Sequence, residues 1–171
     1  ALYRALPGVT GVRCGYANGD SPDHANYDSV CTGITGFREA VEVTWDPSRT
    51  CLEALLFAFF AVVDVELPNR QGADIGTQYQ SGIYWTHPDQ EAAVRAAAAL
   101  EAAAVPFFAV ELKPLENFFP AEEYHQRYLE KHPRGYCHIS PVRRAAVAAY
   151  PFRRENYTRP ARQLLAQFMN G

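Results

Sequence analysis

The chain has 171 residues, a formal net charge of −3 at pH 7, 48% hydrophobic residues and 20% charged residues. This balance indicates a globular domain with a core of ordinary size, and it excludes a disordered chain, a coiled coil and a collagen-like fibre. The longest apolar run, residues 54–63, is about half of the roughly 18 residues that a membrane-spanning helix needs. We therefore expect no membrane partner.

Charge is distributed unevenly along the chain. Residues 141–171 carry six Arg and one Glu, a charge of +5, which leaves −8 for the residues before them. These bases form no dense run and are not interleaved with aromatic residues, so we expect no nucleic-acid partner. We interpret the chain as a domain over residues 1–140 followed by a basic C-terminal extension over residues 141–171, which is solvated and packs against the acidic body.

The first part of the chain predicts two strands. A helix-like segment at residues 1–6 is followed by a Val-rich strand over residues 9–16. A long loop leads to residues 39–45, where apolar and polar residues alternate and predict a half-buried strand with Val41 on its apolar face.

A buried helix and a long polar segment follow. Thr50 and Glu53 have the spacing of a capping box and predict the start of an apolar helix over residues 52–63. Residues 64–81 are polar and too numerous for a plain connection in a compact domain. Long loops of this kind usually carry function.

The remaining elements complete a mixed pattern. We expect a strand over residues 82–85, an Ala-rich helix from Thr86 to about residue 104, a strand over residues 107–112 and a helix over residues 120–131. Interleaved strands and helices of uneven spacing predict an α+β fold, a two-layer α/β sandwich with helices packed on a ferredoxin-like mixed sheet and with long functional loops.

The four cysteines, Cys14, Cys31, Cys51 and Cys137, are scattered and form no Cys-x-x-Cys pair. This spacing argues against a structural zinc site and against a disulfide scaffold, and it suits a reducing, cytoplasmic location. His125, His132 and His138 fit no common metal spacing, so we expect no metal. We interpret Cys14 and Cys51 as packing residues of a strand and a helix.

Polar and glycine-containing motifs gather in two loops and near residue 130. They are Gly15-Tyr16, Val30-Cys31-x-Gly33-x-Thr35-Gly36, Glu39-Ala40-Val41, Asp46-Pro47, Arg70-Gln71-Gly72, Gly76-Thr77-Gln78-Tyr79, Ala121-Glu122-x-Tyr124-His125-Gln126 and Gly135-Tyr136-Cys137. With these eight motifs in this order and spacing, the chain resembles the peptide methionine sulfoxide reductase A family over nearly all of residues 2–138.

The resemblance implies an oxidoreductase that repairs proteins after oxidative stress by reducing the S-epimer of methionine sulfoxide, free or in proteins, to methionine. In such an enzyme a thiolate attacks the sulfoxide sulfur and becomes a sulfenic acid. A second cysteine then closes a disulfide, which thioredoxin or a related dithiol reduces. The implied partners are oxidised proteins and thioredoxin, with no bound cofactor, and we expect a monomer.

Five residues match functional positions of this family. The resemblance makes Glu39 the acid that protonates the sulfoxide oxygen, Tyr27 and Tyr79 the phenols that donate hydrogen bonds to it, Asp74 a carboxylate that arranges the site, and Cys137 the resolving cysteine. Taken without the resemblance, the sequence favours a surface Glu at position 39, and the other residues have ordinary alternatives: packing tyrosines, a loop-capping Asp and a buried inert thiol.

One part of the family pattern is missing. The family's nucleophile lies in a Gly-Cys-Phe-Trp-Gly segment just before the helix that residues 1–6 resemble, and the sequence contains no such segment. We therefore expect a chain truncated before this segment and, as given, inactive or very slow. A selenocysteine upstream of Ala1 and a catalytically dead binding module for methionine-rich partners are the two alternatives.

Overall fold

The computed structural model describes residues 1–171 and has an α+β fold, as expected from the sequence. The strands are β1 (Val9–Ala17), β2 (Arg38–Trp45), β3 (Arg70–Gln71), β4 (Asp74–Ile75), β5 (Gly82–Trp85), β6 (Glu111–Pro114) and β7 (Phe118–Pro120). The α-helices are α1 (Tyr27–Cys31), α2 (Leu52–Phe60), α3 (Glu91–Ala102), α4 (Tyr128–Lys131), α5 (Pro141–Ala149) and α6 (Ala161–Asn170). No helix has the length and apolar character needed to cross a membrane.

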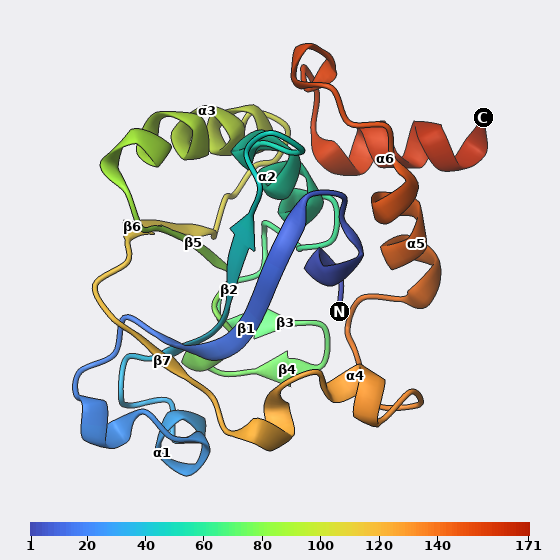
Figure 1. Cartoon of the computed structure of the whole chain (residues 1–171). Helices are drawn as coiled ribbons and strands as arrows, with labels where there is room; N and C mark the ends of the chain where they lie inside the picture. Colours follow the sequence, from blue (N-terminus) through green and yellow to red (C-terminus); the bar gives the residue numbers. More distant parts are fainter.

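The strands form three small sheets instead of the single mixed sheet that we expected. The antiparallel sheet has the order β2-β1-β7, β5 pairs with β6 in parallel, and β3 pairs with β4 within the long polar segment (Figure 1). A half-buried ion pair joins the first two sheets, because Arg38 of β2 donates to Glu111 of β6 at 2.9 Å. The ferredoxin-like arrangement remains a prediction.

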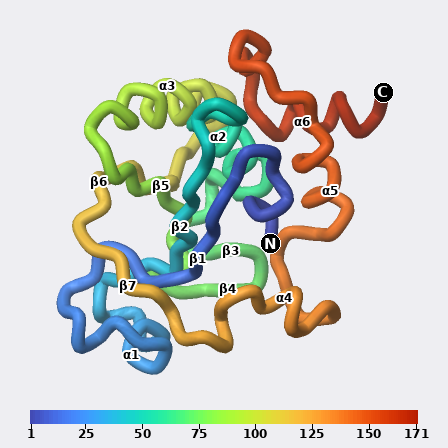
Figure 2. The backbone as a smooth tube through the Cα atoms, viewed as in Figure 1, coloured from blue at the N-terminus to red at the C-terminus, as the bar shows by residue number.

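The largest core cluster lies around α2, and the C-terminal extension contributes to it. The tube in Figure 2 shows α6 beside α2, with α5 next to α6 on the same side of the molecule. Buried residues of the extension in this cluster are Val147, Ala161, Leu164 and Leu165. Basic residues of the extension also meet acidic residues of the body, as expected, since Arg154 donates to Glu53 at 3.0 Å. The extension is therefore attached by apolar packing as well as by charge.

One buried hydrogen-bonded carboxylate anchors this extension. Glu101 of α3 is 4% exposed and accepts hydrogen bonds from the Tyr157 hydroxyl and from the Ala161 amide, each at 2.8 Å. Burial raises the pKa of Glu101, although the two hydrogen bonds oppose the shift. The start of α6 is thus fixed to α3 by a group that loses its solvation when the protein folds.

We expect Tyr157→Phe to destabilise the protein by about 1–3 kcal/mol, because it leaves the buried Glu101 oxygen with one donor fewer. Urea unfolding followed by circular dichroism measures this change. Tyr150→Phe is the matched control. The ring of Tyr150 stacks on that of Phe57 in the same aromatic cluster, with 4.4 Å between the ring centroids, and its hydroxyl forms no hydrogen bond. Equal losses of stability in the two variants would contradict the role of the Tyr157 hydroxyl.

Three local predictions were wrong in instructive ways. The Thr50 capping box does not form, since α2 begins after Cys51 with no side-chain cap. We predicted that the Ala-rich helical segment begins at Thr86, but its N-cap is His87, which forms a capping box with Gln90. The helix predicted over residues 120–131 is broken into a short 3-10 turn and α4 by Arg127, whose φ of 55° is left-handed.

Candidate active site

A cavity of about 610 Å³ lies between β1, β2, α2, β5 and the irregular segment that joins α4 to α5. Most of its walls are apolar. Its polar and titratable lining residues include Cys14, Glu39, Asp74, Tyr79, His125 and Cys137. Four of the five residues predicted from the sequence, Glu39, Asp74, Tyr79 and Cys137, therefore border one space.

Glu39 lies near the start of β2, at the mouth of the cavity. It pairs with Tyr16 of β1, and directly opposed residues of antiparallel strands point to the same face of the sheet. The residue as a whole is exposed, yet the atoms packed around its carboxyl raise its pKa, and the nearby Asp74 carboxylate raises it further. A carboxylic acid with a raised pKa can keep its proton closer to neutral pH.

Two tyrosines approach this acid from separate elements. Tyr79 ends a 3-10 turn, Thr77–Tyr79, and burial and the charge of Glu39 raise its pKa. Tyr27 begins α1, where a hydrogen bond with the Cys31 side chain is the main factor that raises its pKa to about 12. Both phenols therefore keep their protons at neutral pH and can donate hydrogen bonds.

The element that carries Tyr79 is tied to the loop that follows α1. The Thr77 hydroxyl donates to the Gly33 carbonyl at 2.6 Å. This bond brings the long polar segment against the segment that carries Tyr27. Residues 64–81 are therefore not a structureless loop, because they hold the β3–β4 pair and this turn.

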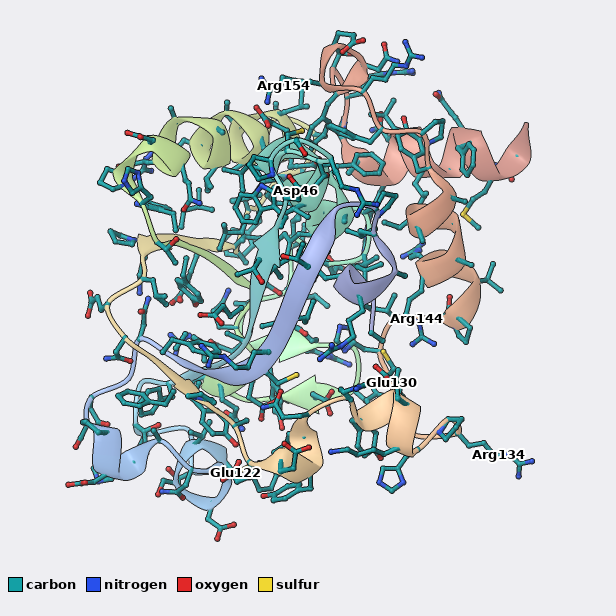
Figure 3. All side chains as sticks on the ribbon, in the orientation of Figure 1. Asp46, Glu122, Glu130, Arg134, Arg144 and Arg154 are labelled. Atoms are coloured by element: carbon teal, nitrogen blue, oxygen red, sulfur yellow. The ribbon has the colours of Figure 1, made fainter.

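Glu122 positions Tyr27, although no role for it was predicted. Its carboxylate accepts from the Tyr27 amide at 2.9 Å and from the Tyr16 hydroxyl at 2.7 Å. These bonds lower the pKa of Glu122 although its partial burial acts in the opposite direction. Figure 3 labels Glu122 in the segment between β7 and α4, at the same end of the molecule as α1.

Gln126 is a second residue whose role was not predicted. Its side-chain oxygen accepts from the Cys14 amide and its side-chain nitrogen donates to the Cys14 carbonyl, both at 2.9 Å. This two-sided clamp holds the chain after β7 against β1. The only signal in the sequence was that Glu122 and Gln126 belong to one of the matched motifs.

Cys14 borders the cavity, and its interpretation as a packing residue stays a prediction. It is half-buried and lines the cavity, because it pairs with Val41 and therefore shares the cavity-facing side of the sheet with Glu39. Val41 is 46% exposed for the same reason, although alternation predicted it on the buried face of its strand.

Comparisons with known proteins agree with the sequence motifs. The family model described as peptide methionine sulfoxide reductase matches residues 1–155. The peptide methionine sulfoxide reductase MsrA of Clostridium acetobutylicum is 42% identical over 144 residues, covering 81% of this chain and 86% of the relative. That of Cronobacter sakazakii is 44% identical over 147 residues, covering 82% and 69%.

Solved structures also match. Mxr1 from Saccharomyces cerevisiae in reduced form superimposes with a TM-score of 0.72 at 34% identity, covering 78% of each chain. Methionine sulfoxide reductase A of Corynebacterium diphtheriae gives a TM-score of 0.72 at 36% identity, covering 80% of this chain and 70% of that one.

Proposed function

The chain belongs to the peptide methionine sulfoxide reductase family and has its methionine sulfoxide reductase activity; from this premise we propose that Glu39 is the acid of the reaction and that the S-epimer is the substrate. The observation that carries the proposal is the Glu39 carboxyl at the cavity mouth, with its pKa raised by burial and by Asp74. Such a group can protonate an oxygen at a pH where an ordinary carboxylate cannot.

The proposed reaction begins when a thiolate attacks the sulfoxide sulfur. Negative charge then develops on the oxygen, which accepts a proton from Glu39 and hydrogen bonds from Tyr27 and Tyr79. The sulfur–oxygen bond breaks, methionine leaves, and the attacking cysteine becomes a sulfenic acid. Asp74 holds the proton on Glu39 through its charge. The apolar walls of the cavity suit the S-methyl group of the substrate.

Recycling completes the proposal. Cys137, on the irregular segment before α5, attacks the sulfenic sulfur and forms a disulfide, with water as the leaving group. Thioredoxin or a related dithiol then reduces that disulfide in a reducing, cytoplasmic compartment. The proposed enzyme is a monomer and needs no metal or bound cofactor, because thiols supply both electrons.

The direct test restores the family's Gly-Cys-Phe-Trp-Gly segment before residue 1 and supplies this protein, fully reduced, with N-acetylmethionine sulfoxide amide as separate S- and R-epimers and dithiothreitol as reductant. We expect methionine from the S-epimer only, measured by chromatography of the product. The same assay with residues 1–171 alone measures how slow the chain is as given. A folded protein that binds the S-epimer without producing methionine would instead support the binding-module alternative.

We expect Tyr27→Phe and Tyr79→Phe each to lower kcat by at least about tenfold, and the double variant by about 10²–10³-fold, because each removes a donor to the developing oxygen charge. Steady-state kinetics with the S-epimer measure kcat and KM separately. Tyr124→Phe is the matched control, since Tyr124 is a 57% exposed tyrosine beside His125. An unchanged kcat in the double variant would contradict the role of the phenols.

A further inference from the structure

We propose that the basic surface around Cys137 binds the protein that recycles the enzyme, and that this partner is a dithiol protein of the thioredoxin type with an acidic surface around its reactive cysteines. The surface is made of the basic and apolar residues that flank Cys137 in the chain: Arg134, Tyr136, Val142, Arg143 and Arg144. We call it the docking surface. The inference rests on the proposed function, in which a disulfide of Cys137 is reduced, and adds the place where the reductant binds and the charge that it carries.

The docking surface lies in the longest stretch of the chain without an acidic residue. Residues 131–154 contain six Lys or Arg residues and no Asp or Glu, although the whole chain has a net charge of −3. The acids just before this stretch already have partners, because Glu123 pairs with Lys131 at 2.9 Å and Glu130 pairs with Arg127. The three arginines of the docking surface form no ion pair, so its positive charge is not neutralised within the chain.

Two of these arginines lie where a positive charge weakens the fold. Ser140 caps α5, and its hydroxyl accepts from the Arg143 amide at 3.2 Å, so Arg143 and Arg144 lie at the start of the helix. The N-terminal end of a helix carries a partial positive charge, which favours Asp and Glu and repels bases. The first turn of α5 contains no acid. Helix stability therefore does not explain the two arginines, whereas binding of an acidic partner does.

The apolar part of the docking surface is exposed beside the reactive sulfur. Tyr136 is 57% exposed and Val142 is 68% exposed, and Cys137 is half-buried. The Tyr136 hydroxyl accepts from the Ala73 amide at 3.3 Å, which holds its ring in place at the surface. Exposed aromatic and apolar side chains among arginines are typical of protein–protein interfaces.

The charges of the docking surface are close to the sulfur. The Arg144 side chain donates to the Ile139 carbonyl at 3.2 Å, which keeps its charge against the segment that carries Cys137. Arg144 and Cys137 also line the same cavity. Figure 3 labels Arg134 and Arg144 on the same edge of the molecule, along the segment that joins α4 to α5. A partner that covers these arginines therefore reaches Cys137.

The reaction at this surface is a thiol–disulfide exchange. A thiolate of the reductant bonds to the Cys137 sulfur, and the disulfide partner of Cys137 leaves as a thiol. The second thiol of the reductant then releases Cys137, so two electrons pass from the dithiol, which becomes a disulfide. Unpaired bases attract an acidic partner before contact and raise the rate of association, and dissolved salt weakens this attraction.

The test measures this exchange without any sulfoxide. Residues 1–171, with the other three cysteines replaced by Ser, react with dithiodipyridine, which converts Cys137 into a mixed disulfide. A reduced thioredoxin of net negative charge then frees the Cys137 thiol and releases pyridinethione, whose absorbance gives the second-order rate constant. Dithiothreitol, a small uncharged dithiol, is the parallel reductant.

We expect the combined change Arg134→Gln and Arg143→Gln to lower the rate constant with thioredoxin about tenfold at low ionic strength. In about 1 M salt the difference should almost disappear, because exposed charges are then screened. The rate constant with dithiothreitol should not change. The matched control is Arg49→Gln with Arg153→Gln, which removes the same charge from exposed positions outside the docking surface and should leave both rate constants nearly unchanged.

A second measurement keeps all four cysteines. It compares kcat/KM for thioredoxin during turnover of the S-epimer by the protein with the family's Gly-Cys-Phe-Trp-Gly segment restored, and the same double change should lower it about tenfold at low ionic strength. Circular dichroism checks that every variant is folded.

The outcomes separate the docking surface from the proposed function. Equal rate constants with thioredoxin for the unmodified and double-variant proteins at low ionic strength would overturn the docking surface. An equal loss with dithiothreitol would also overturn it, because the change would then act on Cys137 itself. Weaker binding of the variant to a DNA duplex, with an unchanged reaction with thioredoxin, would assign the bases to another partner. Absence of sulfoxide reduction with dithiothreitol would instead overturn the proposed function, whatever the result of the exchange reaction.

Discussion

Glu39→Gln should lower the rate of the chemical step by about 10²–10⁴-fold, the range usual for loss of a general acid. Glutamine keeps the size and polarity of the side chain, but it cannot give a proton to the sulfoxide oxygen. The expected change is therefore in kcat, with KM for the S-epimer affected much less. Single-turnover formation of methionine by reduced protein measures the chemical step separately from recycling.

The pH profile separates this role from a structural one. Burial and the Asp74 carboxylate raise the pKa of Glu39, so its proton is retained to higher pH, and the acid-dependent rate should fall as pH rises through that raised value. Asp74→Asn removes the charge that adds to the effect of burial, so the fall should begin at lower pH. The rate of the Glu39→Gln variant should not show this fall with rising pH. Glu91→Gln, at a carboxylate on α3 that pairs with Arg95, should leave the profile unchanged.

Retention of near-normal single-turnover rates by Glu39→Gln at neutral pH would exclude it as the proton donor. The raised pKa would then reflect only the crowding of the cavity mouth. Circular dichroism of the variant checks that it is folded, and little loss of folding is expected because Glu39 is exposed.

Cys137→Ser should spare one turnover and abolish recycling by thioredoxin. The burst of methionine should stay near one per chain, because the first attack does not involve Cys137. Turnover supported by thioredoxin should fall by about 10²-fold or more, since no protein disulfide forms for it to reduce. Dithiothreitol is small enough to reduce the sulfenic acid directly, so turnover with it should persist.

The measurement is the methionine yield per chain over time, with thioredoxin and with dithiothreitol in parallel. Cys51→Ser should match the unmodified protein with both reductants. Undiminished thioredoxin turnover by Cys137→Ser would show that another thiol resolves the sulfenic acid, and peptide mapping of the oxidised variant would identify it.

The parts of the fold that follow local rules were predictable from the sequence. Alternation located β2 to within one residue, and β1 and β5 also lie where they were predicted. The segment around Gln126 was predicted as part of one helix, but Arg127 interrupts it with a left-handed backbone. Beside this break the Gln126 side chain forms hydrogen bonds with the main chain of Cys14, 112 residues earlier. The helical spacing of apolar residues and the Pro or Gly residues that end a helix contain no information about such a distant partner.

The candidate site, like the fold, was only partly predictable from the sequence. The five predicted residues were found through their resemblance to family motifs, and the fold brings Glu39, Asp74, Tyr79 and Cys137 around one cavity. The hydrogen bond from the Tyr27 amide to Glu122 joins residues 95 positions apart, so it could not be predicted from the neighbouring sequence.

The contacts of Glu122 and Gln126 also bear on how a large reductant protein reaches the half-buried Cys137. Hydrogen bonds of Gln126 hold the chain against β1. The chain is held a second time after residue 140, where Val147 packs in the main core. Residues 127–146 are thus a tether with two fixed ends, and Cys137 lies near its middle. Local opening of this tether can deliver Cys137 to the surface while Tyr27, held by Glu122 before the first fastening, keeps its place.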